Sequence, residues 1–287
     1  AREFSKNSNI VAVIGHSQGK TAPTASITYE FNGILFISLV DTSPALTNHG
    51  FKYVFRTTPS DIERSQQLAI FLQTKGLRKI VILHDEIERH RIIAYYIHAF
   101  NYNKEIQTIY QSSYYSGEKQ YYSLLEELKG LEFDAIFLAG QMLDMATLIK
   151  QARELGITAR FIGGDTLESP LLEKIAGNAA EGTIVTTDYN PKSKDKDTRE
   201  FIKVFTKKYK NPPDKSAAKG YDAIKLLAFA IEKGKSSVPG NIAAMLHHTK
   251  NWDGVTGMHS FNLTGDILRK KIFFKKFQDG KFEFIRE

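Results

Sequence analysis

The sequence predicts an α/β protein whose parallel β-sheets are covered by helices on both faces. Three observations support this prediction. Short β-branched or aromatic runs alternate with amphipathic stretches over the first two-thirds of the chain. Helix start and stop signals stand between these runs. The 287 residues, 42% of them hydrophobic and 25% charged, suffice for two soluble domains of ordinary size.

Six short runs have the composition of buried strands. They consist mainly of Val, Ile, Leu and Phe, and Gly or polar residues bound them. The runs are residues 10–14, 34–38, 79–83, 134–139, 160–164 and 182–187. Because amphipathic segments lie between them, parallel pairing is expected.

Helix start and stop signals mark the ends of the segments between these strands. Residues 60–63, Ser-Asp-Ile-Glu, form a capping box, and Gly76 stands at the end of the helix that they begin. A second helix is expected over residues 142–155, with Gly156 as its stop. Its buried face is Met145, Leu148, Ile149 and Ala152.

The pattern changes after Thr187. A polar loop precedes an amphipathic helix at 198–210, and Asn-Pro-Pro separates this helix from a long one at 217–234. The tail, residues 267–285, predicts two strands joined by a hairpin at Asp279-Gly280.

Composition excludes several classes of function. The chain has no Cys, which rules out thiol catalysis, thiolate metal sites and disulfides. No apolar run approaches the ~20 residues of a membrane-spanning helix. The net charge is +7, but Lys and Arg are spread along the chain, so no nucleic-acid partner is expected. Neither a metal nor a cofactor is expected, since the His residues are scattered and no H-E-x-x-H or G-x-G-x-x-G motif is present.

Residues 15–19, Gly-His-Ser-Gln-Gly, match the G-x-S-x-G pattern of a hydrolase nucleophile elbow. Such an elbow follows several strands and an oxyanion loop, whereas only one predicted strand precedes Ser17. The downstream His247 and His248 stand at a helix end, and His259 in an ordinary turn, rather than in a triad. A Gly-rich strand-to-helix turn is therefore favoured, no enzyme activity is expected, and a Ser17 esterase is kept as a remote alternative.

Five stretches, taken in order, carry a family resemblance: VAVIGHSQGKTAPTASITYEFNGILFISLVDTSPALTNHGFKYVFRTTPSD, KIVILHD, DAIFLAGQMLDMATLIKQARELGITARFIGGD, IAGNAAEGTIVT and GYDAIKLLAFAIEKG. Together they resemble the periplasmic leucine/isoleucine/valine-binding proteins, the type I solute-binding proteins of branched-chain amino acid ABC transporters. The resemblance covers nearly the whole chain with similar gaps, which makes it far more specific than any short motif.

The resemblance implies two doubly wound, parallel-sheet lobes joined by hinge crossings that close on a small ligand. Lobe one would comprise residues 1–58 and 188–256, and lobe two residues 59–187 and 257–287. The family's opening β-α-β-α unit has no counterpart here. Lobe one is therefore expected to be N-terminally incomplete, and the chain to be a fragment or processed form of a longer protein.

The resemblance also implies a set of ligand contacts. The family's binding positions fall on Gly19, Val40, Thr42, Arg89, Gln141 and Asp165. Each follows a predicted strand closely, and ligands of open α/β sheets bind beyond the carboxyl ends of strands.

Chemical roles can be given to these positions for an amino acid zwitterion. The amides of Gly19, Lys20 and Thr21 would donate to its carboxylate at a helix start. The Thr42 hydroxyl would accept from its ammonium group or donate to its carboxylate. Asp165 would accept from the ammonium group, with capping of the next helix as the alternative.

Two departures from the family change the expected ligand. Gly19 replaces a serine, and Arg89 and Gln141 replace aromatic side chains. With Lys20 and Asp41 nearby, a polar or acidic ligand is expected instead of an apolar one. The predicted function is an extracytoplasmic, periplasmic solute-binding protein whose signal peptide is not in this chain and whose partner is an ABC permease. A ligand sensor, or a degenerate relative acting by protein interaction, is the alternative; the oligomeric state stays open.

Overall fold

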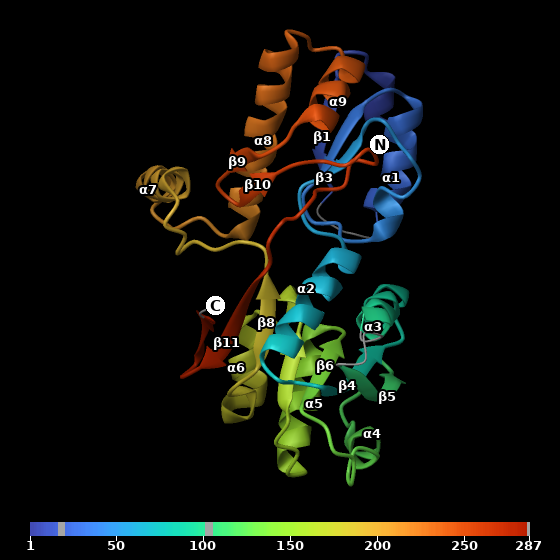
Figure 1. Ribbon diagram of the computed structural model, residues 1–287, viewed down its shortest axis with the longest axis vertical. Coiled ribbons are helices and arrows are strands. Elements are labelled where there is room, and N and C mark those ends of the chain that lie inside the picture. The colour runs from blue at the N-terminus through green and yellow to red at the C-terminus, as the bar shows by residue number, and fades with distance from the viewer. Residues whose placement is uncertain (17–20, 101–105, 286–287) are drawn as a thin grey trace. The chain divides into compact units, whose positions relative to one another are not determined.

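The computed structural model describes residues 1–16, 21–100 and 106–285, and the chain divides into two compact units (Figure 1). Unit 1 comprises Ala1–Asp61 and Asp188–Lys271. Unit 2 comprises Ile62–Thr187 and Ile272–Glu287. The chain therefore crosses between the units three times, after Asp61, after Thr187 and after Lys271.

Unit 1 is built on a three-stranded parallel sheet in the order β1-β2-β3. Its strands are β1 (Ala12–Gly15), β2 (Leu35–Ser38) and β3 (Val54–Arg56). Two apolar clusters show that helices cover both faces: α1 (Ala22–Phe31) and η2 (Pro44–Leu46) pack on one, and α8 (Lys215–Gly234) and α9 (Pro239–His248) on the other. The remaining elements of this unit are η1 (Phe4–Lys6), α7 (Lys196–Tyr209), β9 (Trp252–Gly254) and β10 (Gly257–His259).

Unit 2 holds a seven-stranded sheet in the order β12-β11-β8-β7-β6-β4-β5. The parallel strands are β4 (Lys79–Asp85), β5 (Gln107–Tyr114), β6 (Ala135–Ala139), β7 (Arg160–Gly163) and β8 (Ile184–Thr187). The antiparallel hairpin β11 (Phe273–Gln278) and β12 (Lys281–Phe284) extends the sheet beyond β8.

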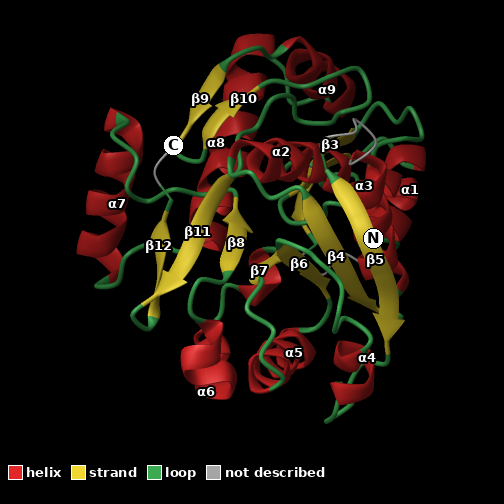
Figure 2. Cartoon of the chain, turned by 60° about the horizontal axis from the view of Figure 1, so that its bottom comes forward, coloured by secondary structure: helices red, strands yellow, loops and turns green. Residues whose placement is uncertain are grey.

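Helices also cover both faces of the sheet in unit 2. One apolar cluster joins the sheet to α2 (Asp61–Thr74) and α3 (Glu88–Phe100). The other joins it to α4 (Tyr122–Glu126), α5 (Met142–Glu154) and α6 (Pro170–Ala176), which Figure 2 shows together on one side of the sheet. Two short 3₁₀ turns, η4 (Asp165–Leu167) and η5 (Gly177–Ala180), flank α6.

The structure confirms the α/β prediction. All six predicted runs contain strands, the helices predicted at 142–155, 198–210 and 217–234 are α5, α7 and α8, and the tail forms the predicted hairpin. Asp279 and Gly280 both have positive φ, as the tight hairpin turn requires. Four strands were not predicted. β3, β9 and β10 have only three residues each, and β5 is a largely polar strand at the sheet edge.

The structure corrects the expected division of the tail. Residues 257–271, expected in lobe two, lie in unit 1. Here β10 pairs with β9, and Phe261 and Ile267 enter the apolar cluster of α8 and α9. Local sequence did not reveal this long-range packing. His259, expected in an ordinary turn, is fully buried in β10.

Gly265 provides a test of the close packing in unit 1. Its φ is +83°, and a Cβ atom there would lie 1.9 Å from the Val54 carbonyl oxygen. We expect Gly265→Ala to lower the free energy of unfolding by more than about 2 kcal/mol, through backbone strain and this clash. The control is Gly257→Ala, because Gly257 has φ +98° but nothing within 4 Å of its Cβ position; about 1 kcal/mol is expected there. Urea unfolding followed by fluorescence of the single Trp measures both variants, and equal losses would contradict the packing argument.

Candidate functional site

The three parallel strands of unit 1 end at one edge of its sheet, where the first predicted site residues lie. The predicted turn after β1 is only partly visible, because Ser17, Gly19 and Lys20 lie outside the described residues. Thr21 is described and is the N-cap residue of α1, although its side chain makes no capping hydrogen bond. The amide-donor and esterase interpretations of residues 17–20 therefore stay predictions.

The loop after β2 carries Val40 and Thr42, which are half-buried and buried respectively. Hydrogen bonds within the loop and to the end of β2 stabilise its conformation. The Asp41 carboxylate, 1% exposed, accepts from the Ser43 backbone N–H at 2.7 Å, and the Asp41 N–H donates to Ser38 Oγ at 3.4 Å. The Asp61 N–H donates to the Thr42 carbonyl at 2.8 Å. The backbone of the loop is thus hydrogen-bonded on both sides of Thr42.

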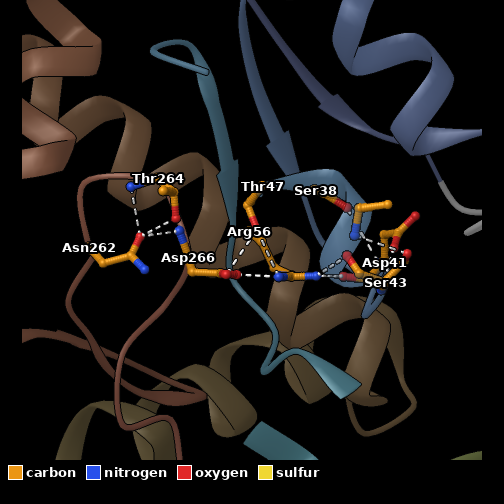
Figure 3. A network of polar contacts seen from close by, with 9 residues as sticks. Ser38, Asp41, Ser43, Thr47, Arg56, Asn262, Thr264 and Asp266 are labelled. Atoms are coloured by element: carbon orange, nitrogen blue, oxygen red, sulfur yellow. Dashed lines mark hydrogen bonds and ion pairs between the residues drawn. The ribbon is translucent and has the colours of Figure 1, made fainter. Parts of the chain in front are cut away.

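Arg56, the last residue of β3, lies at the centre of a polar network beneath this loop (Figure 3). It is fully buried, and its guanidinium donates in three directions. Nη1 reaches the carbonyls of Asp41 at 3.4 Å and Ser43 at 2.6 Å, and Nη2 reaches Thr47 Oγ1 at 3.0 Å. Nε donates to Asp266 Oδ1 at 2.7 Å, and Nη2 forms an ion pair with the same oxygen.

Asp266 is held in turn by the loop that carries it. Its backbone N–H donates to Asn262 Oδ1 at 2.9 Å, and its Oδ2 accepts from Thr47 Oγ1 at 2.9 Å (Figure 3). Sequence reasoning missed both Arg56 and Asp266. The available signal was an Arg inside a buried strand, since Arg is almost never fully buried unless it is paired.

Two further buried charged residues of unit 1, Asp188 and Lys270, lie close to the crossings. Asp188 directly follows the second crossing, and its Oδ2 accepts from Lys219 Nζ at 2.6 Å and from Thr58 Oγ1 at 2.5 Å. Thr58 precedes the first crossing by three residues. This carboxylate therefore ties two crossing segments to α8.

The segment before the third crossing is anchored by Lys270, which is 3% exposed. Its Nζ donates to Thr256 Oγ1 at 2.8 Å and lies 3.3 Å from His259 Nε2. The Asp222 carboxylate accepts from the backbone N–H groups of Val255 and Thr256 in the same cluster.

Burial dominates the electrostatics of this cluster. It lowers the pKa of Lys270 to about 8, although the carboxylates of Asp222 and Asp188 act in the opposite direction. Burial also raises the pKa of Asp222, against the hydrogen bonds from Thr256. The pKa of His259 lies well below 6.5, because burial and the neighbouring Lys270 charge both disfavour the imidazolium. His259 is therefore neutral in the folded protein at neutral pH.

In unit 2, the other predicted site residues follow β4, β6 and β7. Gln141 is the exposed N-cap residue of α5, and its side chain makes no capping hydrogen bond. Asp165 is the half-buried first residue of η4. The helix after it is capped by Ser169, whose Oγ accepts from the Leu171 N–H, so Asp165 does not have the alternative role of capping α6. Arg89 lies in the first turn of α3, and its side chain is outside the described residues.

A polar cluster that sequence reasoning missed lies at the same edge of unit 2. Asp85, at the end of β4, is fully buried; its Oδ1 accepts from the Ile87 N–H at 3.0 Å and lies 2.7 Å from His90 Nδ1. The Tyr114 hydroxyl fills the space where a Cβ atom of Gly140 would lie. Burial and the nearby Asp85 charge raise the pKa of Tyr114. Because Gly140 directly precedes Gln141, this cluster supports the loop that carries a predicted ligand contact.

The described residues do not form two other kinds of site. Within the described ranges, no group of three or more His, Cys, Asp or Glu side chains could hold a metal ion. Nor does that part of the chain contain a helix long and apolar enough to cross a membrane.

Comparison with known proteins gives consistent matches. A family model described as periplasmic binding protein matches residues 1–281. The leucine-specific-binding protein of Salmonella typhimurium is 28% identical over 280 residues, which are 96% of this chain and 73% of that protein. The leucine-, isoleucine-, valine-, threonine-, and alanine-binding protein of Pseudomonas aeruginosa is 27% identical over 266 residues, 91% of this chain and 70% of that protein.

A solved structure agrees with these matches. The ABC transporter substrate-binding protein of Desulfitobacterium hafniense, in complex with Leu, is 32% identical with a TM-score of 0.89. The match covers 99% of this chain and 83% of that chain.

The buried His259 predicts a pH dependence of stability. Below pH 6.5 the unfolded chain binds a proton at His259 that the folded protein does not, because the folded-state pKa is lower. The free energy of unfolding should therefore fall with falling pH, and this residue should contribute up to about 1.4 kcal/mol per pH unit until its folded-state pKa is reached. Urea unfolding between pH 5 and 7 measures the slope.

His259→Gln should remove this contribution to the slope, whatever it does to absolute stability. The control is His248→Gln, which makes the same substitution at an exposed position at the end of α9, outside the buried cluster. An unaltered slope in His259→Gln would contradict the assignment.

Proposed function

This chain belongs to the periplasmic binding protein family, and from that premise we propose that it is the substrate-binding protein of an ABC transporter. Its ligand would be one amino acid or a related small polar solute. The observation that carries the proposal is the loop after β2, where Thr42 lies in a backbone held by Arg56, Asp41 and Asp61 at the carboxyl edge of the sheet. The names of the similar proteins, which bind leucine and related amino acids, support the same class of ligand.

The ligand contacts of unit 1 would recognise the amino acid backbone. Thr42 offers a hydroxyl that either donates to a carboxylate or accepts from an ammonium group. Thr21, with Gly19 and Lys20, would supply backbone N–H groups at the start of α1. Val40 would contribute the apolar part of this surface. Each of these contacts is uncharged apart from the Lys20 side chain, which suits the zwitterion shared by all amino acids.

The contacts of unit 2 would select the ligand's charge and side chain. Asp165 would accept from the ammonium group; the cap of α6 is Ser169 and not this residue. Gln141, exposed at the N-terminus of α5, offers both a donor and an acceptor. Gln141 and Arg89 stand where aromatic side chains are expected, so we propose a ligand with a polar or acidic side chain.

Binding would close the units by bending at the three crossings, after Asp61, Thr187 and Lys271. No covalent chemistry is required. We propose that the closed protein delivers its ligand to an ABC permease and that it acts in the periplasm. The absence of enzyme activity stays a prediction, and labelling of Ser17 by a fluorophosphonate probe would overturn it.

Site variants should separate binding from stability. In a thermal-shift screen of the common amino acids, a ligand at a hundred times its Kd should stabilise the protein by about 2.7 kcal/mol. Loss of a hydrogen bond to a charged group costs roughly 1.5–3 kcal/mol. Asp165→Asn should therefore weaken binding of the best ligand by roughly 10- to 100-fold in titration calorimetry.

Thr42→Val should weaken the same binding by about 10-fold, because one hydrogen bond is lost. Matched controls are Glu168→Gln, near Asp165 but ion-paired with Lys275, and Thr249→Val, whose hydroxyl donates to Met245 in α9. Both should leave Kd unchanged. If folded wild-type protein shows no shift with any amino acid or small carboxylate, the result would favour a sensor or a relative acting by protein interaction.

A further inference from the structure

We propose that Arg56 is a positioning residue for ligand binding, which acts by fixing the backbone on both sides of Thr42. This inference rests on the proposed function, because it assigns to Thr42 a contact with the ligand. It goes further by naming a residue that touches no ligand itself.

The hydrogen bonds of Arg56 Nη1 support this role. The nitrogen reaches the carbonyl oxygens of Asp41 and Ser43, the residues immediately before and after Thr42. A single donor group therefore bridges the residues on either side of Thr42, and Figure 3 shows these contacts of Arg56 with Asp41 and Ser43. Since the position of a side chain follows its backbone, the guanidinium sets where the Thr42 hydroxyl lies.

The guanidinium is fixed in turn from its opposite side. Nε and Nη2 both pair with Asp266 Oδ1, and Nη2 also donates to Thr47 Oγ1. Asp266 belongs to the 262–266 loop, five residues before the third crossing, and its N–H bonds to Asn262. The planar fork of Arg meets these acceptors on two sides at once, which the single ammonium group of Lys cannot do.

Arg56→Lys is the direct test, since it keeps the charge and removes the fork. In the ligand-free protein, we expect hydrogen–deuterium exchange of the 38–47 segment to become at least 10-fold faster, with exchange in α8 and α9 unchanged. The control is Asp222→Asn, which perturbs a buried carboxylate of the same unit that bonds Val255 and Thr256. It should leave exchange at 38–47 unchanged.

A second variant covers failure of Arg56→Lys to fold. Thr47→Val removes one acceptor of Arg56 and one donor to Asp266. It should accelerate exchange of the same segment by at least three-fold. Unchanged exchange at 38–47 in the folded variants would overturn the proposal, whether or not any ligand binds.

Titration calorimetry with L-leucine and L-glutamate then tests whether the affinity for a ligand depends on the ordered conformation of the 38–47 segment. For a probe that the wild-type protein binds, Arg56→Lys should weaken the binding affinity at least 10-fold in the wild-type background. In the Thr42→Val background the loss should be less than three-fold. Equal losses in both backgrounds would show that Arg56 does not act through Thr42 and would overturn the proposal. If the wild-type protein binds neither probe, the proposed function fails for these ligands, while the exchange result still decides whether Arg56 orders the loop.

Discussion

The burial of one charge, that of Arg56, organises the edge of unit 1 at which its parallel strands end. A fully buried guanidinium is costly unless its donors are satisfied, and removal of one partner from such a pair typically costs about 3–5 kcal/mol. Here the acceptors for this guanidinium come from the loop after β2, from Thr47 and from Asp266 in the 262–266 loop. Segments that are 210 residues apart in sequence are thereby required to meet at one place.

A second constraint is the common direction of the strands. In both units the parallel strands end at one edge, so the loops that follow them gather there without any specific pairing of their side chains. What each unit adds is a buried polar support beneath those loops. In unit 1 it is Arg56 with Asp266, and in unit 2 it is Asp85 with His90, beside the Tyr114 hydroxyl that packs on Gly140.

The crossings between the units depend on buried charge as well. Thr58 and Asp188 bond to each other near two crossings, and Lys219 joins them to α8. Lys270, next to the third crossing, is bonded to Thr256 within the same unit. All three crossing segments are therefore anchored in unit 1 by polar contacts. The proposed closure would need such fixed points, because a hinge confines motion to a few residues.

Local sequence patterns were enough to predict six strands, the helices α2, α5, α7 and α8, and the tail hairpin, because each depends on a periodicity or a turn signal within a few residues. It also placed Thr42 and Asp165 after strands, where the structure has them. Three features became evident from the three-dimensional packing alone: residues 257–271 belong to unit 1, His259 is buried, and Arg56 pairs with Asp266. These features arise from contacts between distant segments, and no local pattern records which buried charge will find which partner.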